Sequence, residues 1–547
     1  MDNHLVSRAF SLYAELLQLH GQGEQLSDWL AGAAYRIRQL EQPVMDLSKE
    51  ELAEQFRPEI VDIINEGRKR QSIAALEELI QLTPPGLFDM MRIKGLGGRK
   101  LHVLWQTAKI DTIEGLLAAA KAGQLRGIPG FGAKTEANII EAIDAMNSSA
   151  ELFHYASVAG LADQFVSDLQ KRFDTHLVSL CGDIRRQTTT VHRIEVLAGV
   201  PLNRDRLKKL MNVSEQTETE TSGHTHDEVP VTVYQVEPGR FYHELFIRTG
   251  SNGHTKKVLA KASDLNSEEI IYESAGLPFI PPELREDVAE WEWAKYPQPL
   301  VVTSDIRGVV HNHTDWSDGV DRLENFARAC LQKGFEYVVI SDHSQNAHYA
   351  GGLKPDKVLR QIAEIEKLNQ KLAPFKIFKS IECDILVSGE LDYDAELLSR
   401  FDMVIVSVHQ QLKMAEEKAT ARLIKAIENP FTTILGHMTG RQLLVRPGYP
   451  VDFKKVIDAC AANGVVIEIN ANPYRLDMDW SHIPYALEKG VMISVNPDSH
   501  SIHEIDNIRW GVSAARKGGL TKAMTWNAQP LSFIEQWLAK RTGSYAK

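Results

Sequence analysis

The sequence has few cysteines, no long apolar run and no excess of positive charge, and each lack narrows what the chain can be. Its 547 residues include four cysteines, which lie far apart and form no CxxC pair. This argues against a disulfide framework and against a cysteine-based zinc site. No apolar run is long enough to cross a bilayer, and the first residues, MDNHLVSRAF, lack a secretory signal pattern. We therefore expect a cytoplasmic protein without membrane contact.

The charge balance limits how the chain could contact nucleic acid. The formal net charge is −12, whereas a protein that covers nucleic acid with its whole surface is basic. Any such contact must come from local patches and backbone donors. Nineteen histidines are present, many in the C-terminal half beside Asp or Glu. A carboxylate-rich metal protein shows this acidic total before its cations are counted.

The pattern of apolar residues changes twice along the chain. Residues 1–150 carry apolar residues at three- and four-residue spacing, as in HLVSRAFSLYAELLQLH, and predict helices. Residues 150–300 contain short runs that predict strands: THLVSL, VHRIEVLAGV, VPVTVYQVE and FYHELFIRTG. The polar stretch between them, SEQTETETSGHTHDE, is expected to be an exposed loop. A Pro-rich, acidic stretch then predicts a linker.

From residue 306 the order strand, turn, helix repeats. The candidate strands are IRGVVHNH, YVVISDH, IFKSIECDI, MVIVSVH, TTILGHM, VVIEINAN and MISVNPDSH. Repeated βα units imply a parallel sheet, and seven of them favour a closed or nearly closed barrel.

Metal-binding residue types recur at the C-terminal ends of these strands. In chain order they are His311, His313, Asp318, Asp342 with His343, Glu382, His409, His437, Asp498 and His500. The C-terminal strand ends of a barrel converge on one face, so these residues should meet in space. A single buried histidine is more often structural, but the whole set predicts a metal site.

The ligand types indicate the metal and the chemistry. Imidazole mixed with carboxylate, without thiolate, suits Mn²⁺, Zn²⁺ or Fe²⁺ better than Ca²⁺, Mg²⁺ or Cu⁺. The set is too large for one ion, whereas two or three ions that share carboxylates would use it fully. Such a cluster favours phosphoester hydrolysis, because it lowers the pKa of a water and holds phosphate oxygens.

These motifs, together with Ser317-Asp318-Gly319, resemble the PHP domain (polymerase and histidinol phosphatase). GHMTGRQLLVR, EINANPYRLDMDW and NIRWGVSAARKGGL resemble in particular the PHP domain of bacterial family X DNA polymerases. The resemblance implies a Mn²⁺ site with nine ligands: His311, His313, Asp318, His343, Glu382, His409, His437, Asp498 and His500. Among these, His343, Asp498 and His500 are the candidate catalytic residues. Arg441 and Arg475 are candidates to hold phosphate, with a surface or salt-bridged role as the alternative.

Two glycine-rich segments, IKGLGGRK and LRGIPGFGAKT, resemble helix-hairpin-helix turns. Glycines let the backbone approach a DNA phosphate, and N–H groups at the next helix start bind it. The alternative is a pair of ordinary glycine-containing helix connections. The implied DNA contacts are Gly95, Gly97, Arg99, Lys100, Gly127, Gly130, Gly132 and Lys134.

The middle region resembles the palm of family X polymerases through LCGDIRRQTTTVHRIEVLAG and FIRTGSNGH. In this pattern Asp183 replaces a serine, the two metal-binding aspartates fall at Arg193 and Glu195, and the third falls near Thr232. Nucleotidyl transfer needs Mg²⁺ held by those carboxylates. An arginine there puts a fixed positive charge where a cation must bind, so we expect an inactive polymerase.

We therefore predict a multidomain chain, with a helical domain at 1–85 and a helix-hairpin-helix region at 86–150, together all-α. These are followed by an α+β nucleotidyltransferase-like palm and thumb at 151–290, a linker at 291–304 and a distorted (β/α)7 PHP barrel at 305–547. The predicted function is that of a metal-dependent DNA phosphoesterase in DNA repair. Its predicted activity is that of a 3′–5′ exonuclease, and AP endonuclease activity is a further candidate. The alternatives are a histidinol-phosphate type phosphatase and a non-catalytic DNA-binding scaffold.

Overall fold

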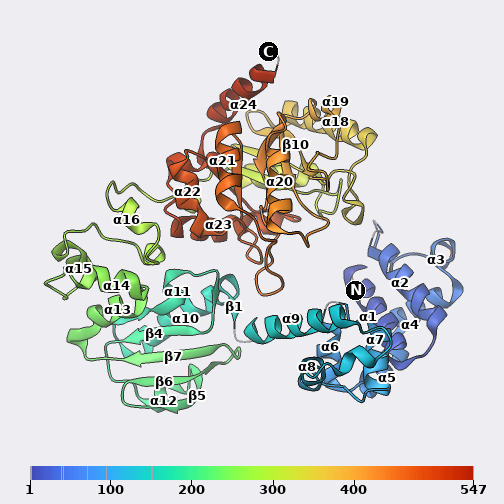
Figure 1. The fold of residues 1–547 in the computed structure, drawn as a ribbon, viewed down its shortest axis with the longest axis horizontal. Coiled ribbons are helices and arrows are strands. Elements are labelled where there is room, and N and C mark those ends of the chain that lie inside the picture. The colour runs from blue at the N-terminus through green and yellow to red at the C-terminus, as the bar shows by residue number, and fades with distance from the viewer. Residues whose placement is uncertain are drawn as a thin grey trace. The chain divides into compact units, whose positions relative to one another are not determined.

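The computed structural model describes residues 3–38, 40, 42–70, 72–93, 95–149 and 152–545. It divides into two compact units, Met1–Ala150 and Glu151–Lys547 (Figure 1). Within the described ranges, no helix has both the length and the apolar character needed to span a membrane. The finer domain boundaries inside each unit stay predictions.

The N-terminal unit is helical, as predicted. Its main helices are α1 (Asn3–His20), α2 (Glu24–Arg38), α3 (Lys49–Gln55), α4 (Pro58–Arg70), α5 (Ala74–Leu82), α6 (Pro85–Met91), α7 (Gly98–Gln106), α8 (Ile113–Lys121) and α9 (Ala133–Ser149). Their apolar faces share one core, which includes Phe10, Leu30 and Leu101. This shared core joins the two glycine-rich turns to the helices before them.

The second unit begins with a small α+β region. Helix α10 (Tyr155–Phe173) packs against a five-stranded sheet in the order β2-β4-β7-β6-β5. The strands are β2 (Val178–Leu180), β4 (Ile194–Ala198), β5 (Met211–Gln216), β6 (Glu220–Thr225) and β7 (Pro230–Gln235). A separate ladder pairs β1 (Phe153–His154) with β3 (Thr190–Val191). Short helices α11 (Gly182–Arg186) and α12 (Arg204–Leu207) complete this region.

Two local predictions are wrong in this region. FYHELFIRTG is helix α13 (Phe241–Thr249), because its buried residues Phe241, Leu245, Phe246 and Thr249 follow a helical period, which their β-favouring side chains obscure. The polar stretch 214–228 is largely the hairpin of β5 and β6 rather than a loop. Alternate residues of β6 are buried, and threonine suits a strand.

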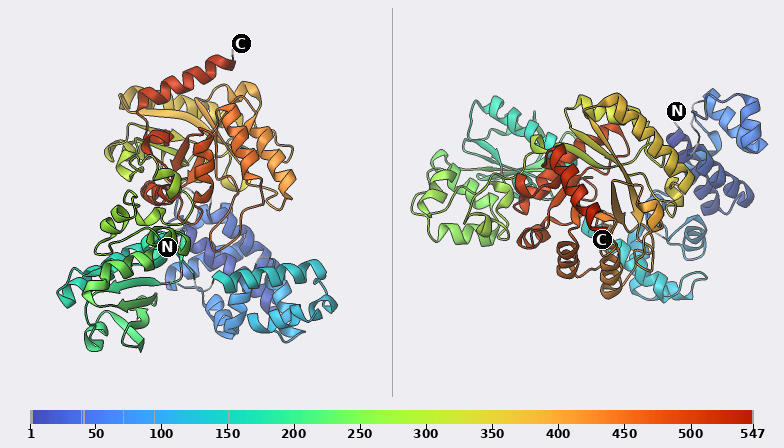
Figure 2. Two further views of the ribbon diagram at one scale, coloured as in Figure 1. Left: turned by 60° about the vertical axis from the view of Figure 1, so that its left-hand side comes forward. Right: turned by 90° about the horizontal axis from the view of Figure 1, so that it is seen from above.

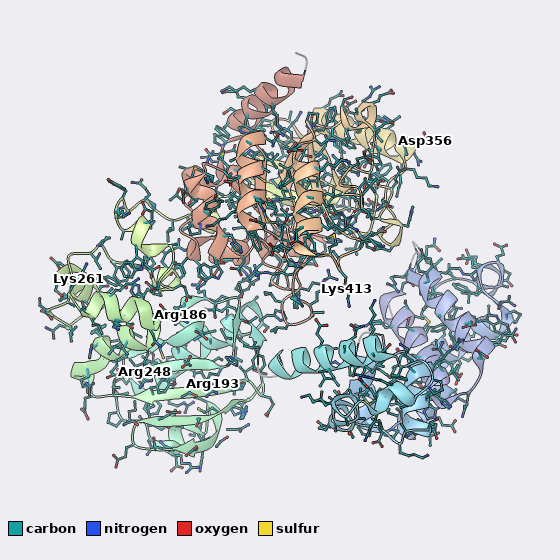
Figure 3. All side chains as sticks on the ribbon, in the orientation of Figure 1. Arg186, Arg193, Arg248, Lys261, Asp356 and Lys413 are labelled. Carbon is teal, nitrogen blue, oxygen red and sulfur yellow. The ribbon has the colours of Figure 1, made fainter. Side chains whose placement is uncertain are left out.

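Helices α14 (Asn252–Leu259), α15 (Glu268–Ser274) and α16 (Glu290–Trp293) lead on to the barrel. A fully buried lysine, Lys517, joins this first part of the unit to the last. Its Nζ donates to the carbonyl oxygens of Arg186 (3.0 Å) and Glu283 (3.3 Å) and pairs with Glu286 (2.5 Å). Arg186 lies on the side of the α+β region that faces the barrel (Figure 3).

The barrel contains seven parallel strands in chain order: β8 (Gly308–Asn312), β9 (Tyr337–Ile340), β10 (Lys376–Asp384), β11 (Met403–Ser407), β12 (Thr432–Leu435), β13 (Val466–Asn470) and β14 (Ile493–Asn496). The flanking helices include α17 (Leu323–Gln332), α18 (Pro355–Leu372), α19 (Ala395–Leu398), α20 (Glu416–Ile427), α21 (Phe453–Asn463), α22 (Ile483–Glu488), α23 (Ile508–Lys517) and α24 (Leu531–Tyr545). Helices α20 and α21 lie side by side on the outside (Figures 1 and 2). The predicted barrel is confirmed.

Side chain and backbone bonds bridge the gap between the first and last strands. Asn527 donates from Nδ2 to the carbonyl oxygens of Gly308 (3.2 Å) and Val495 (2.7 Å). At the other end of the seam, His313 N donates to Ser499 O (2.8 Å). The barrel is therefore nearly closed, and the C-terminal ends of all seven strands surround one mouth.

Candidate metal centre

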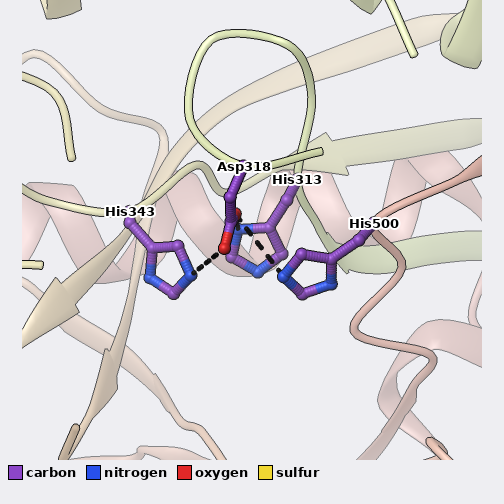
Figure 4. Close-up of side chains that lie close together, drawn as sticks. All are labelled: His313, Asp318, His343 and His500. Carbon is purple, nitrogen blue, oxygen red and sulfur yellow. Dashed lines mark ion pairs between the residues drawn. The ribbon is translucent and has the colours of Figure 1, made fainter. Parts of the chain in front are cut away.

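The nine predicted ligands meet at that mouth, each with a donor atom close to those of its neighbours. They form four overlapping groups: His313, Asp318, His343 and His500; His311, His313 and Glu382; His311, His437 and Asp498; His343, Glu382 and His409. Figure 4 shows the first group, with Asp318 between His343 and His500. Its carboxylate oxygens lie 3.6 Å from His343 Nε2 and 3.5 Å from His500 Nε2.

Glu382, at the end of β10, lies at the centre of the cluster. Its Oε1 lies 3.2 Å from His311 Nε2, 3.2 Å from His409 Nε2 and 2.9 Å from His437 Nε2. Its Oε2 lies 3.0 Å from His343 Nδ1. Four histidines, from β8 and from the ends of β9, β11 and β12, thus converge on one buried carboxylate of β10.

The donor set fits divalent cations. Both Glu382 oxygens, His311 Nε2 and His343 Nδ1 are buried and have no hydrogen bond of good geometry among the described residues. Buried polar atoms rarely stay unsatisfied, and these are the atoms that cations between the side chains would bind. Cys383, the residue after Glu382, belongs to none of the four groups, and burial raises the pKa of its thiol to about 12.

The charges of the cluster are strongly coupled. Burial alone would lower the pKa of His343, but the Glu382 and Asp318 carboxylates outweigh it and raise this pKa to about 10. For His313, burial and the neighbouring His500 and His343 lower the pKa to about 3. Glu382 and Asp498 have pKa values well below the usual range, because adjacent imidazoles outweigh their burial. The carboxylates are thus ionised and ready to bind cations.

Two ligands adopt a backbone conformation that is uncommon for residues with a side chain. His311 has a φ of +63° and Asp498 a φ of +52°. Such left-handed residues cluster at functional sites, where the surrounding structure holds them in place. Here the conformation belongs to the ends of β8 and β14, the two strands beside the seam.

A second layer of residues, which the sequence analysis missed, orients the ligands. Glu468 of β13 accepts a hydrogen bond from His311 Nδ1 (2.6 Å) and another from His437 N (3.0 Å). Asp384 pairs with His409 Nδ1 in the same way. The sequence did hold one signal for this role, because Glu468 is the charged residue inside the apolar run VVIEIN. Carboxylates in this position fix the tautomer and raise the basicity of a ligating imidazole.

Asp342, which the sequence placed with His343, orients a loop instead of joining a ligand group. Its carboxylate accepts hydrogen bonds from Thr314 N and Thr314 Oγ1 (both 2.8 Å), Ser317 Oγ (2.5 Å) and Gln361 Nε2 (2.6 Å). These bonds hold the loop that carries Asp318 over the mouth.

Replacing Glu468 by glutamine is expected to weaken metal binding by about 10- to 100-fold, the usual effect of such a change. The amide keeps the size of the side chain but removes the charge beside His311. Titration of the metal-free protein with Mn²⁺ measures the effect. Unchanged affinity would show that Glu468 has no role in orienting the ligands.

The two predicted phosphate-binding arginines differ in their surroundings. Arg441 donates to the carbonyl oxygens of Arg475 (2.9 Å) and Leu476 and to Asp479 (2.6 Å), so its guanidinium is engaged within the loops. This geometry favours the salt-bridged alternative for Arg441. Arg475 has its Nε 3.8 Å from Asp498 Oδ2 and is partly exposed at the edge of the cluster. Arg475 is the better candidate to meet a phosphate.

The two glycine-rich turns of the N-terminal unit have the same local geometry. Gly95 and Gly130 have φ values of +91° and +88°, and Gly97 and Gly132 directly precede helices α7 and α9. A Cβ atom added at any of these glycines would meet nothing within 4 Å. The backbone at both turns is therefore open to a ligand.

The basic residues beside these turns are less uniform. Arg99 Nη2 lies 3.0 Å from Glu24, and Lys100 Nζ donates to Gly95 O (3.0 Å). Lys134 is exposed at the start of α9, and Gly127 ends the short helix before the second turn. Of the predicted cations, Lys134 is the one best placed to attract a phosphate.

The α+β region brings together the three positions where a palm would carry carboxylates. Glu195 and Thr232 are direct partners in the β4–β7 ladder. Arg193 Nη1 donates to Thr232 Oγ1 (3.3 Å), and Tyr234 donates its hydroxyl hydrogen to Glu195 (3.1 Å). Arg193 and Arg248 are labelled in Figure 3. The Arg193 guanidinium thus lies beside Thr232, at the positions where the sequence comparison with the palm expects carboxylates.

Comparison with known proteins agrees with this architecture. Residues 88–145 match the model of the SAM-like helix-hairpin-helix tandem, and residues 310–472 match that of the PHP domain. Fold and site together define a protein with a metal-dependent PHP domain preceded by helix-hairpin-helix motifs.

Full-length similarity defines the family more closely. The chain is 31% identical over 511 residues to the DNA polymerase/3′-5′ exonuclease PolX of Bacillus subtilis (strain 168), covering 88% of this chain and 89% of that protein. It therefore belongs to the PolX family. A probable phosphatase of Thermoanaerobacter sp. (strain X514) is 26% identical over 42% of this chain and 94% of its own length. A probable phosphatase of Shewanella sp. (strain MR-4) is 24% identical over 42% of this chain and 90% of its length.

Proposed function

We propose that the protein is a Mn²⁺-dependent DNA phosphoesterase that removes nucleotides from 3′ ends, with an inactive polymerase region. The observation that carries the proposal is the cluster around Glu382, whose two oxygens lack good hydrogen bonds although four imidazole nitrogens lie 2.9–3.2 Å away. When bound, the ions would lower the pKa of a water and neutralise charge on the phosphate.

The protein's own residues would bind and protonate the substrate. His500 is the most exposed imidazole of the cluster, with 35% of its side chain accessible, and Asp318 beside it is 33% accessible. The substrate would approach from this edge, where His500 or His343 can protonate the leaving oxygen. Arg475 would bind a non-bridging phosphate oxygen.

DNA is favoured as substrate by the two open turns of the N-terminal unit and by the PolX relative, which its name describes as a 3′-5′ exonuclease. The phosphatase relatives match 42% of this chain and favour small phosphate esters as the second candidate. PHP domains alone do not determine the substrate. The turns support DNA as the substrate, because a metabolite phosphatase has no use for them.

The direct test compares two substrates in Mn²⁺: 5′-labelled DNA and histidinol phosphate. We expect stepwise shortening of the DNA from its 3′ end and negligible phosphate release from histidinol phosphate. Lys134→Glu should slow DNA hydrolysis and leave the hydrolysis of bis-p-nitrophenyl phosphate unchanged. Faster turnover of histidinol phosphate would establish the phosphatase instead. Less than one ion bound per chain and no activity in Mn²⁺ would favour a DNA-binding scaffold.

A further inference from the structure

One residue of the polymerase-like region contacts the loops at the mouth of the metal centre. His154, at the end of β1, donates from Nε2 to the carbonyl oxygen of Leu443 (3.1 Å). Its ring also packs edge-on against Tyr474, with the ring centroids 4.8 Å apart and the planes at 81°. Leu443 follows β12 and Tyr474 follows β13, so His154 contacts both loops at once.

These two loops are tied to each other at the same place. Leu443 N donates to Tyr474 O (2.7 Å), and Arg441 Nε donates to Arg475 O (2.9 Å). His154 therefore binds the two residues that form the first of these links. Its contact adds a third partner, from a distant part of the chain, to this joint, which lies at the surface, where Tyr474 is 59% exposed.

The second loop leads directly to a predicted metal ligand. Tyr474 N donates to Asn472 Oδ1 (3.0 Å), and Asn472 N donates to Asn470 Oδ1 (3.1 Å). Asn470 Nδ2 in turn donates to Asp498 Oδ2 (2.9 Å), the oxygen that lies 3.8 Å from Arg475 Nε. A continuous set of hydrogen bonds thus connects the joint at His154 with the cluster.

His154 is held in place by its own region. It pairs with Thr190 in the β1–β3 ladder, Tyr155 N donates to Thr189 O (3.1 Å), and Ser157 Oγ donates to His154 O (2.7 Å). The buried Lys517 fixes the same region to the barrel. The position of His154 relative to the mouth is therefore determined by rigid contacts on both sides.

We infer that His154 is a positioning residue of the nuclease: the polymerase-like region, in which Arg193 and Thr232 stand at two of the three expected carboxylate positions, fixes the loop that presents Arg475 to the substrate phosphate. This inference rests on the proposed function. It gives the inactive region a role in the reaction of the other domain, carried by one hydrogen bond and one ring contact.

The test is a double-mutant cycle measured with DNA in Mn²⁺. His154→Ala is expected to raise KM about tenfold and to leave kcat within about twofold, because one hydrogen bond and one aromatic contact position a binding group. His154→Gln keeps an N–H donor and should recover part of the loss. In an Arg475→Ala background, His154→Ala should have no further effect, because the two residues act through one contact.

Controls separate this role from a structural one. His176→Ala changes an exposed histidine of the same region and should behave as the wild type, and all variants should bind the same amount of Mn²⁺. Independent losses that multiply in the double variant, or wild-type kinetics of His154→Ala, would overturn the inference. Amide hydrogen exchange gives a readout without activity: His154→Ala should speed exchange at 440–446 and 472–476, and unchanged exchange would also overturn it. An inactive wild type would refute the proposed function instead.

Discussion

Replacing Asp498 by asparagine is expected to lower the rate of DNA hydrolysis by about 10³-fold while DNA affinity changes by less than about twofold. Loss of a charged ligand removes several kcal/mol of transition-state stabilisation, at about 1.4 kcal/mol per factor of ten. Asp498 Oδ1 lies 3.1 Å from His313 Nε2 and 3.7 Å from His311 Nε2, so the change removes a negative charge beside two other ligands. Single-turnover cleavage and fluorescence anisotropy at fixed salt measure the two effects.

A matched control is Asp356→Asn, the same chemical change at an exposed position on α18 (Figure 3). It should retain full activity. His311→Ala should repeat the effect of Asp498→Asn, since both residues belong to the group with His437. Equal loss of cleavage and of DNA binding would contradict a division of labour between the barrel and the helical turns.

The second prediction concerns polymerase activity. We expect the protein to show no template-directed incorporation of dNTPs on gapped DNA, in Mg²⁺ or in Mn²⁺. Two metal ions need carboxylates at adjacent positions, and here Arg193 and Thr232 occupy two of the three positions, bonded to each other at 3.3 Å. The assay is primer extension by the Asp498→Asn variant, because its disabled nuclease cannot degrade a product.

A known polymerase on the same gapped substrate provides the positive control. Extension by this protein would mean that other carboxylates bind the ions and that the alignment with the palm is wrong. The remaining carboxylate, Glu195, is bonded to Tyr234, and burial raises its pKa above the usual range. Both features weaken it as a metal ligand.

The metal cluster was the part of the site most open to prediction. Its residues follow β-branched runs that read clearly as strands, and barrel geometry alone brings strand ends together. Glu468 was missed because it lies inside a strand, where one charge among apolar residues predicts burial but not a partner. FYHELFIRTG was misassigned because aromatic residues favour strands locally, whereas packing against the neighbouring helices and sheet decided for a helix.

The sequence by itself determined the fold class of the chain and the set of residues able to bind metal, since composition and period reflect local backbone preference and burial. Only the tertiary structure decided which atoms meet: Glu382 among four imidazoles, Glu468 behind His311, and His154 on the loops beside Arg475. Contacts between residues far apart in the sequence, such as His154 and Leu443, which are 289 positions apart, leave no periodic signal. They depend on how helices and strands pack against one another after they have formed.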